Sequence, residues 1–66
     1  MSVARTTEIT ASSGKSFDDA IDKGVKRACK TLQNVTGAWI MDQEAVIKDG
    51  KISSYKVRMK VTFILK

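Results

Sequence analysis

Apolar and polar residues alternate along the last third of the chain. From Tyr55 onward every second residue is apolar, and the residues between them are mostly charged or polar, with Ile64 as the exception. Successive side chains of a β-strand point to opposite faces of a sheet, so this period of two predicts a strand over 52–65 with one buried face. The apolar face holds Tyr55, Val57, Met59, Val61, Phe63 and Leu65. The opposite face holds Lys56, Arg58, Lys60, Thr62 and Lys66.

A spacing of three and four residues marks the segment 15–32, KSFDDAIDKGVKRACKTL. This spacing places the apolar and small residues on one stripe and predicts an amphipathic helix. Ser16 with Asp19 has the form of a capping box, which marks the start of the helix. Glycine within a helix costs about 0.5–1 kcal/mol relative to alanine, so Gly24 predicts a close approach between helix and sheet. The stripe consists of Phe17, Ala20, Ile21, Gly24, Val25, Ala28 and Leu32.

Two further strands complete the predicted fold. The segment 3–11 is rich in valine, threonine and isoleucine, which suit a pleated sheet, and Ser12, Ser13 and Gly14 then break it. A second strand is predicted over 38–48, and Asp49-Gly50 is a hairpin signal that pairs it antiparallel with the last strand. We therefore predict a single α+β domain over 1–66 with the order β-α-β-β. Its three-stranded sheet packs its apolar face on the helix.

The size of the domain predicts an assembly. A domain of 66 residues hides only about 60% of the surface that its unfolded chain exposes. With one cysteine there is no internal disulfide, and no zinc-type cluster replaces it. The second strand is apolar on both faces, with Ala38 and Ile40 on one and Trp39 and Met41 on the other. One helix covers one face, so we expect another subunit to cover the second.

Charge alone leaves the class of ligand open. Twelve basic and seven acidic side chains give a net charge of +5, which suits nucleic acid, an acidic surface or an anionic small molecule. The row Lys56, Arg58 and Lys60 could follow phosphates, but a single-strand binder interleaves aromatic side chains with its cations. Tyr55 and Phe63 lie on the opposite face, so we expect a solvated face and no nucleic-acid partner. In an assembly the same row could concentrate an anionic, nucleotide-like cofactor.

Nothing in the sequence indicates catalysis. There is no histidine to act as a base, so we interpret Cys29 as a small buried or half-buried thiol. Asp42 and Glu44, close to a turn, are interpreted as solvated charges. The amino terminus lacks the apolar core of a signal peptide, and no run approaches the length of a membrane span. We therefore expect a non-enzymatic cytoplasmic protein with no metal site and no membrane partner.

Three stretches of the chain carry a resemblance to a known family. These are EITASSGKSFDDAI in the first strand and helix, KTLQNV at the helix end, and the hairpin DGKISSYKVRMKVTFIL. With them the chain resembles the dodecin family over essentially its whole length, and the hairpin is the most specific part. The resemblance implies a curled sheet that wraps around the helix. It also implies a hollow homododecamer that stores or sequesters flavin.

The resemblance also implies a binding site. In dodecins two flavin rings stack between tryptophans of neighbouring subunits, and a polar side chain of the last strand bonds the pyrimidine edge. For this chain that implies FMN or riboflavin as the ligand. The implied binding residues are Trp39, Gly37, Gln43, Lys56 and Arg58.

The site departs from the family pattern at several positions. The family's tryptophan position falls on Gly37, and Trp39 follows two residues later, on the same face but displaced by about 7 Å. The glutamine that usually follows the hairpin tyrosine is Lys56. The positions at which bacterial relatives place arginines for a flavin phosphate fall on Glu44 and Ile64.

These departures leave two readings open. Trp39 provides a stacking surface in a shifted pocket for which Gly37 makes room, or it seals a subunit interface, and the two roles are compatible. The hypothesis is a non-catalytic flavin-binding assembly. The alternative is a dodecin-like shell whose altered pocket takes another flat or anionic ligand.

Overall fold

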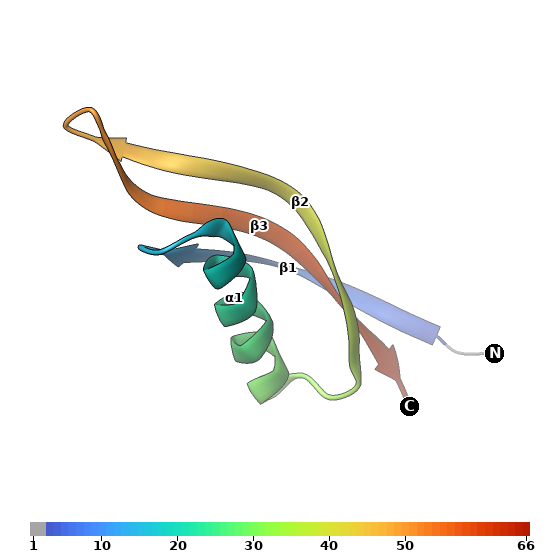
Figure 1. The fold of residues 1–66 in the computed structure, drawn as a ribbon. Coiled ribbons are helices and arrows are strands. Elements are labelled where there is room, and N and C mark those ends of the chain that lie inside the picture. Colours follow the sequence, from blue (N-terminus) through green and yellow to red (C-terminus); the bar gives the residue numbers. More distant parts are fainter. Residues whose placement is uncertain (1–2) are drawn as a thin grey trace.

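The computed structural model describes residues 3–66. The elements follow the order β1 (Val3–Ser13), α1 (Phe17–Thr31), β2 (Val35–Lys48) and β3 (Lys51–Leu65). The three strands form one antiparallel sheet in the order β1-β3-β2, and α1 lies against one face of it (Figure 1). The predicted β-α-β-β fold is confirmed. None of the helices in this described range is long and apolar enough to cross a membrane.

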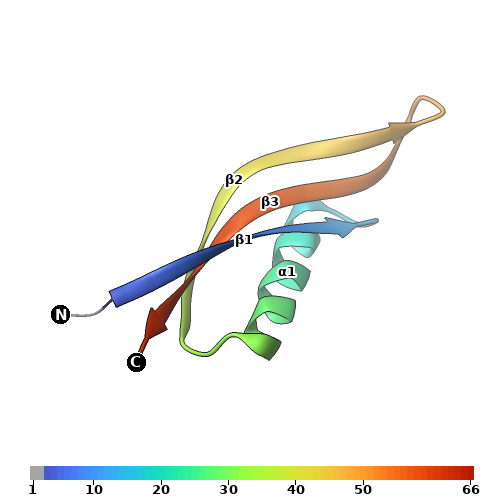
Figure 2. The same cartoon turned by 180° about the vertical axis from the view of Figure 1, so that it is seen from behind.

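The strictly alternating strand is the centre of the sheet. β3 pairs with β1 from Leu65 to Tyr55 without interruption, and with β2 along its other edge. The start of β1 and the end of β3 lie at one end of the sheet, and the β2-β3 hairpin lies at the other (Figure 2). The outer edges of β1 and β2 pair with no strand in the described part of the chain. The protomer thus ends in two open edges, which proteins usually pair or cover.

All three strands are longer than predicted, β3 by the single residue Lys51. β1 continues through Ser12 and Ser13, which pair with Lys56 and Tyr55, and β2 begins at Val35 instead of residue 38. Serine is a weak strand former, but pairing with the long β3 outweighs that local preference. At the other end, Asp49 and Gly50 have φ angles of 54° and 75°. Two consecutive positive φ values are those of a type I′ turn, so the predicted hairpin turn is confirmed.

The core is narrow and lies between α1 and the middle of β3. Val57, Met59 and Val61 are completely buried, which confirms the centre of the predicted apolar face, while Leu65 at the end of the strand is 48% exposed. A Cβ atom on Gly24 would lie 2.9 Å from Cε of Met59 and 3.0 Å from Cβ of Ala11. The helix therefore approaches the sheet as closely as the glycine predicts. Along α1 the buried residues are Ala20, Gly24 and Ala28.

The prediction for Cys29 is wrong, because its thiol is exposed. The helix touches the sheet along the line of Ala20, Gly24 and Ala28, which repeats every four residues. Cys29 is turned by about 100° from Ala28 around the helix axis. Small residues allow a close but narrow contact, and that contact leaves Cys29 in solvent.

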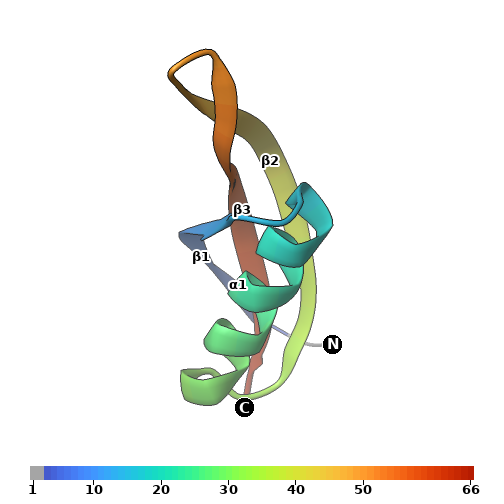
Figure 3. The same ribbon diagram turned by 60° about the vertical axis from the view of Figure 1, so that its left-hand side comes forward.

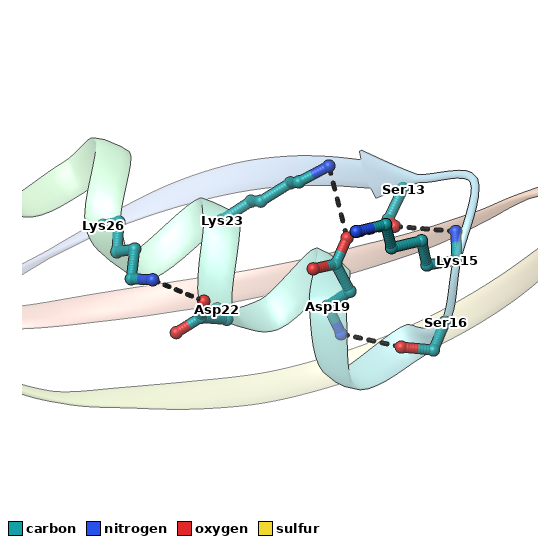
Figure 4. A network of polar contacts seen from close by, with 7 residues as sticks. All are labelled: Ser13, Lys15, Ser16, Asp19, Asp22, Lys23 and Lys26. Carbon is teal, nitrogen blue, oxygen red and sulfur yellow. Dashed lines mark hydrogen bonds and ion pairs between the residues drawn. The ribbon is translucent and has the colours of Figure 1, made fainter.

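Only one of the two hydrogen bonds of the predicted capping box is formed at the start of α1. Ser16 Oγ accepts a hydrogen bond from the Asp19 N–H at 2.9 Å. The carboxylate of Asp19 does not return to Ser16, as a full capping box requires. Instead, Asp19 accepts a hydrogen bond from Ser13 Oγ and pairs with Lys23 Nζ at 3.2 Å (Figure 4). Ser13, itself buried, also accepts the N–H of Lys15 at 2.9 Å, so this cluster joins the end of β1 to the start of α1.

Acid should loosen this junction. The hydrogen bond from Ser13, with a smaller effect of Lys23, lowers the pKa of Asp19 below its ordinary value of 3.8. A depressed carboxyl pKa stabilises the fold above the unfolded-state pKa, and the contribution is lost as the pH falls through the folded-state value. Ser13→Ala removes the larger cause. We expect urea unfolding, followed by circular dichroism between pH 2 and pH 7, to show a weaker dependence on pH below about pH 4 in the variant than in the native protein.

Asp18→Asn is the matched control for this experiment. Asp18 is an exposed acid in the same helical turn, and its replacement leaves the Ser13–Asp19 contact in place. This variant should keep the acid dependence of the native protein. Identical pH profiles for Ser13→Ala and the native protein would contradict the assignment to Asp19.

Candidate functional site

The face of the sheet turned away from α1 carries three polar rows across the strands. This outer face is built from the residues of β3 that alternate with the buried ones, together with their partners on β1 and β2. In each row a cation of β3 lies between a residue of β1 and a residue of β2. The rows are Glu8, Lys60 and Trp39; Thr10, Arg58 and Asp42; and Ser12, Lys56 and Glu44.

Trp39 lies open on this face. Its side chain is 70% exposed in the protomer, so it is not a filler of the helix-side core. Lys60 Nζ lies 5.8 Å from the centroid of the indole ring, within the range of a cation–π contact. Gly37, opposite Thr62, lies on the same face as Trp39. The lysine ammonium lies over one side of the ring, and much of the aromatic surface stays exposed.

A β-bulge at Met41 places the polar groups beside the tryptophan. Ile40 pairs with Met59 and Asp42 pairs with Arg58, so Met41 is an extra residue in β2. A bulge shifts the alternation of the strand by one residue. Strict alternation would put Trp39 and Asp42 on opposite faces, whereas the bulge puts both on the outer face. The register partners Lys60 and Arg58 are two residues apart, so the backbone positions of Trp39 and Asp42 are about 7 Å apart along the sheet.

Two cross-strand ion pairs follow the bulge. Arg58 Nη2 donates a hydrogen bond to Asp42 Oδ2 at 2.6 Å, and this hydrogen bond to Asp42 raises the pKa of Arg58 above its ordinary value. Lys56 Nζ lies 3.4 Å from Glu44 Oε1. All four side chains are about half exposed, from 44% for Lys56 to 68% for Glu44. Asp42 and Glu44 are thus exposed, as expected, but each is paired with a cation.

The ion pairs line a shallow hollow of about 490 Å³. It unites three of the predicted site residues, Gln43, Lys56 and Arg58, while Trp39 and Gly37 lie further along β2, outside its lining. The sequence interpretation missed the role of the two acids, because the facing of Asp42 depends on a bulge that no local pattern signals. The lining consists of Thr10, Asp42, Gln43, Glu44, Lys56 and Arg58.

Charge balance on the outer face argues against a phosphate-tracking surface. Lys56 and Arg58 are each compensated by a carboxylate within 4 Å, and Lys60 lies opposite Glu8 in the register. Non-specific nucleic-acid binding depends on cations that can release the counterions of phosphates. The three cations therefore meet three acids on the same face. Within residues 3–66 no group of three or more His, Cys, Asp or Glu side chains could hold a metal ion.

A second hollow lies on the helix side, beside the free edge of β1. It has a volume of about 540 Å³ and lies between β1 and α1. Ile9, Ala11 and Leu32 contribute its apolar lining, while Lys23 and Arg27 contribute its charged residues. None of the predicted site residues lines it. Trp39, Gly37, Lys56 and Arg58 therefore belong to the outer face. Gln43 pairs with the buried Val57, so it lies on the other face of β2 and only borders the hollow.

The family model for Dodecin matches residues 3–66. The chain belongs to the dodecin family. Dodecins are small flavin-binding proteins that form homo-oligomers and are known as non-enzymatic. The β-α-β-β topology of the described protomer agrees with this assignment.

Solved dodecin structures share the fold closely. The dodecin from Streptomyces davaonensis is 34% identical, with a TM-score of 0.93 over 98% of this chain and 96% of that one. The dodecin from Streptomyces coelicolor is 28% identical, with a TM-score of 0.93 over 98% of this chain and 93% of that one. The tt0972 protein from Thermus thermophilus has the same fold at 24% identity, with a TM-score of 0.93 over 100% and 97% of the two chains. No curated protein sequence matches this chain significantly.

Proposed function

We propose that this dodecin binds a flavin without transforming it, with the isoalloxazine ring against Trp39 where copies of the chain meet. The assembly is a homododecameric shell, and its role is to store the flavin and keep its free concentration low. The observation that carries this proposal is the 70% exposed indole on the uncovered face of the sheet. A flat ligand stacked on this exposed aromatic surface would remove it from water and stabilise the complex.

The surface area of the protomer supports an assembly. A monomeric protein of 7.3 kDa is expected to expose about 4,200 Å², whereas this protomer exposes 4891 Å². Its extents of 50 × 19 × 13 Å explain the excess, because the hairpin projects beyond α1 (Figure 3). Exposed apolar side chains at both ends of the sheet, among them Val3 and Ile47, contribute to this excess of exposed surface. Burial of this surface between copies supplies the stability that the narrow core lacks.

The outer face fits a flavin ring in two respects. Offset stacking of flat rings is worth about 0.5–1.5 kcal/mol beyond the area that it buries. The hollow beside Trp39 presents donors from Arg58 and Lys56 and acceptors from Asp42 and Glu44. A flavin edge carries both an N–H donor and carbonyl acceptors, and it needs both kinds of partner when water is removed. The ion pairs can thus serve where the family's single amide side chain is replaced by Lys56.

The alternative is a flat ligand other than a flavin. The departures at Gly37 and Lys56 motivate it, since they change the position of the ring and the chemistry of its edge. Within this alternative an anionic ligand is less favoured than a neutral one, because Lys56 and Arg58 are already paired with carboxylates. Packing of Trp39 against a second copy is compatible with either ligand, because aromatic side chains are commonly enriched at interfaces. The expected cytoplasmic location stays a prediction.

Titration with riboflavin and FMN tests the proposal. Stacking on Trp39 should quench the emission of a bound flavin strongly, and the quenching should saturate as protein is added. Native mass measurement of the same sample should show one discrete large species and no monomer. Unchanged emission of both flavins in excess protein would contradict the flavin proposal, and a folded monomer in dilute solution would contradict the shell.

A further inference from the structure

The paired charges beside Trp39 indicate which kind of flavin the site takes. Building on the proposed function, we propose that the site prefers a flavin without a phosphate on its ribityl tail, such as riboflavin, to FMN and FAD. Asp42 and Glu44 are the residues that decide this preference. They act by occupying the two cations that could otherwise bind a phosphate, and by repelling the phosphate themselves.

The contacts show that these cations are already occupied. Arg58 Nη2 is 2.6 Å from Asp42 Oδ2, and Lys56 Nζ is 3.4 Å from Glu44 Oε1. A phosphate monoester carries a charge between about −1.5 and −2 at neutral pH. Arg58 and Lys56 keep further N–H donors, but a phosphate that they bind would lie beside the carboxylate that the same cation already holds. Like charges placed against the wrong ligand are a common source of specificity.

Lys60, the third cation of these rows, does not offset this repulsion. Lys60 lies on the indole ring and opposite Glu8 on β1. The three rows therefore hold three cations and three acids, and their charges balance. The +5 excess of the chain must lie outside these rows, for example at Lys30 of the helix and at Lys48 and Lys51 of the hairpin. Exposed charges more than about 8 Å away are largely screened at physiological salt, so the local acids dominate.

A neutral tail meets no such penalty. The hydroxyl groups of a ribityl chain both donate and accept hydrogen bonds. They can bond Thr10 and the carboxylates of the hollow while both ion pairs stay closed. The same acids that repel a phosphate therefore provide acceptors for an uncharged polyol.

Dissociation constants measured by quenching of riboflavin and FMN test this selectivity. We expect riboflavin to bind about fivefold more tightly than FMN at low salt, the size of effect given by one or two unit charges at solvent-exposed contacts. Added salt should move the ratio of the two constants toward one. The double variant Asp42→Asn, Glu44→Gln should do the same at low salt, because its cations are free to meet the phosphate.

Asp22→Asn is the matched control. Asp22 forms an equally exposed ion pair, with Lys26 Nζ at 2.9 Å, and it lies on α1 away from the outer face. Its loss changes the net charge by one unit and should leave the riboflavin-to-FMN ratio as it is. Saturable quenching with FMN bound as tightly as riboflavin, or a ratio unmoved in the double variant, would overturn the selectivity while the flavin proposal stands. Absence of quenching by either flavin would overturn both.

Discussion

Replacement of Trp39 by alanine should abolish the quenching of flavin fluorescence. The indole is the one large aromatic surface on the described outer face, and its side chain is 70% exposed in the protomer. Stacking gives about 0.5–1.5 kcal/mol beyond the apolar area that it buries, and an aromatic side chain buries 150–250 Å². The loss of both terms corresponds to a decrease in flavin affinity of about a hundredfold or more. Fluorescence titration with riboflavin measures it directly.

Two further measurements separate the roles of this ring. Trp39→Phe keeps a flat side chain and should retain weaker quenching, which alanine does not. Native mass measurement of Trp39→Ala should still show the large assembly, because the apolar surface of the protomer is spread over both ends of the sheet. Dissociation of this variant into monomers would show that the indole chiefly packs one copy against another.

Truncation of Met59 should have the largest effect on stability. Met59 is completely buried at the centre of β3, where its side chain fills the space left by Gly24. We expect Met59→Ala to lower the free energy of unfolding by about 2–5 kcal/mol, through lost burial and an unfilled cavity. Small domains have a total of about 5–15 kcal/mol, so this variant should be largely unfolded at moderate urea concentrations.

The comparison needs two controls at one fixed protein concentration, since the stability of an assembly depends on it. Met59→Leu conserves volume and should cost less than about 1.5 kcal/mol. Met41→Ala truncates the same side chain at the bulge, where it is 37% exposed, and should cost clearly less than the buried site. Urea unfolding followed by circular dichroism measures all three. Equal losses at Met41 and Met59 would contradict the position of the core.

Family membership and the detailed site rest on different kinds of evidence. The family is shown by a match over residues 3–66, and the shared fold extends to structures of 24–34% identity. The site depends on a few side chains, and here several of them differ from the family pattern. Glu44, which falls where bacterial relatives place an arginine, forms an ion pair with Lys56, which replaces the family's glutamine. Two departures that look unrelated in the sequence are therefore one paired change in space.

Local patterns were sufficient for most of the fold. The alternation in β3, the stripe on α1, the Asp49-Gly50 turn and the close approach at Gly24 depend on residues within a few positions of one another. Each of these features can therefore be predicted from the sequence, and each is confirmed in the structure. The predicted strand ends were wrong at Ser12 and Ser13, where pairing with a distant strand overrides the local preference of the residues.

The sequence by itself determined the elements, their order and the presence of a sheet face that the single helix leaves uncovered. Only the tertiary structure decided that β3 is central, that Cys29 is exposed, and that Trp39 and Asp42 share a face. The physical reason is that a bulge and a strand order are set by hydrogen bonds between segments far apart in the chain. A shift of one residue in that pairing turns a side chain from one face of a sheet to the other. The residues next to it in the sequence do not indicate such a shift.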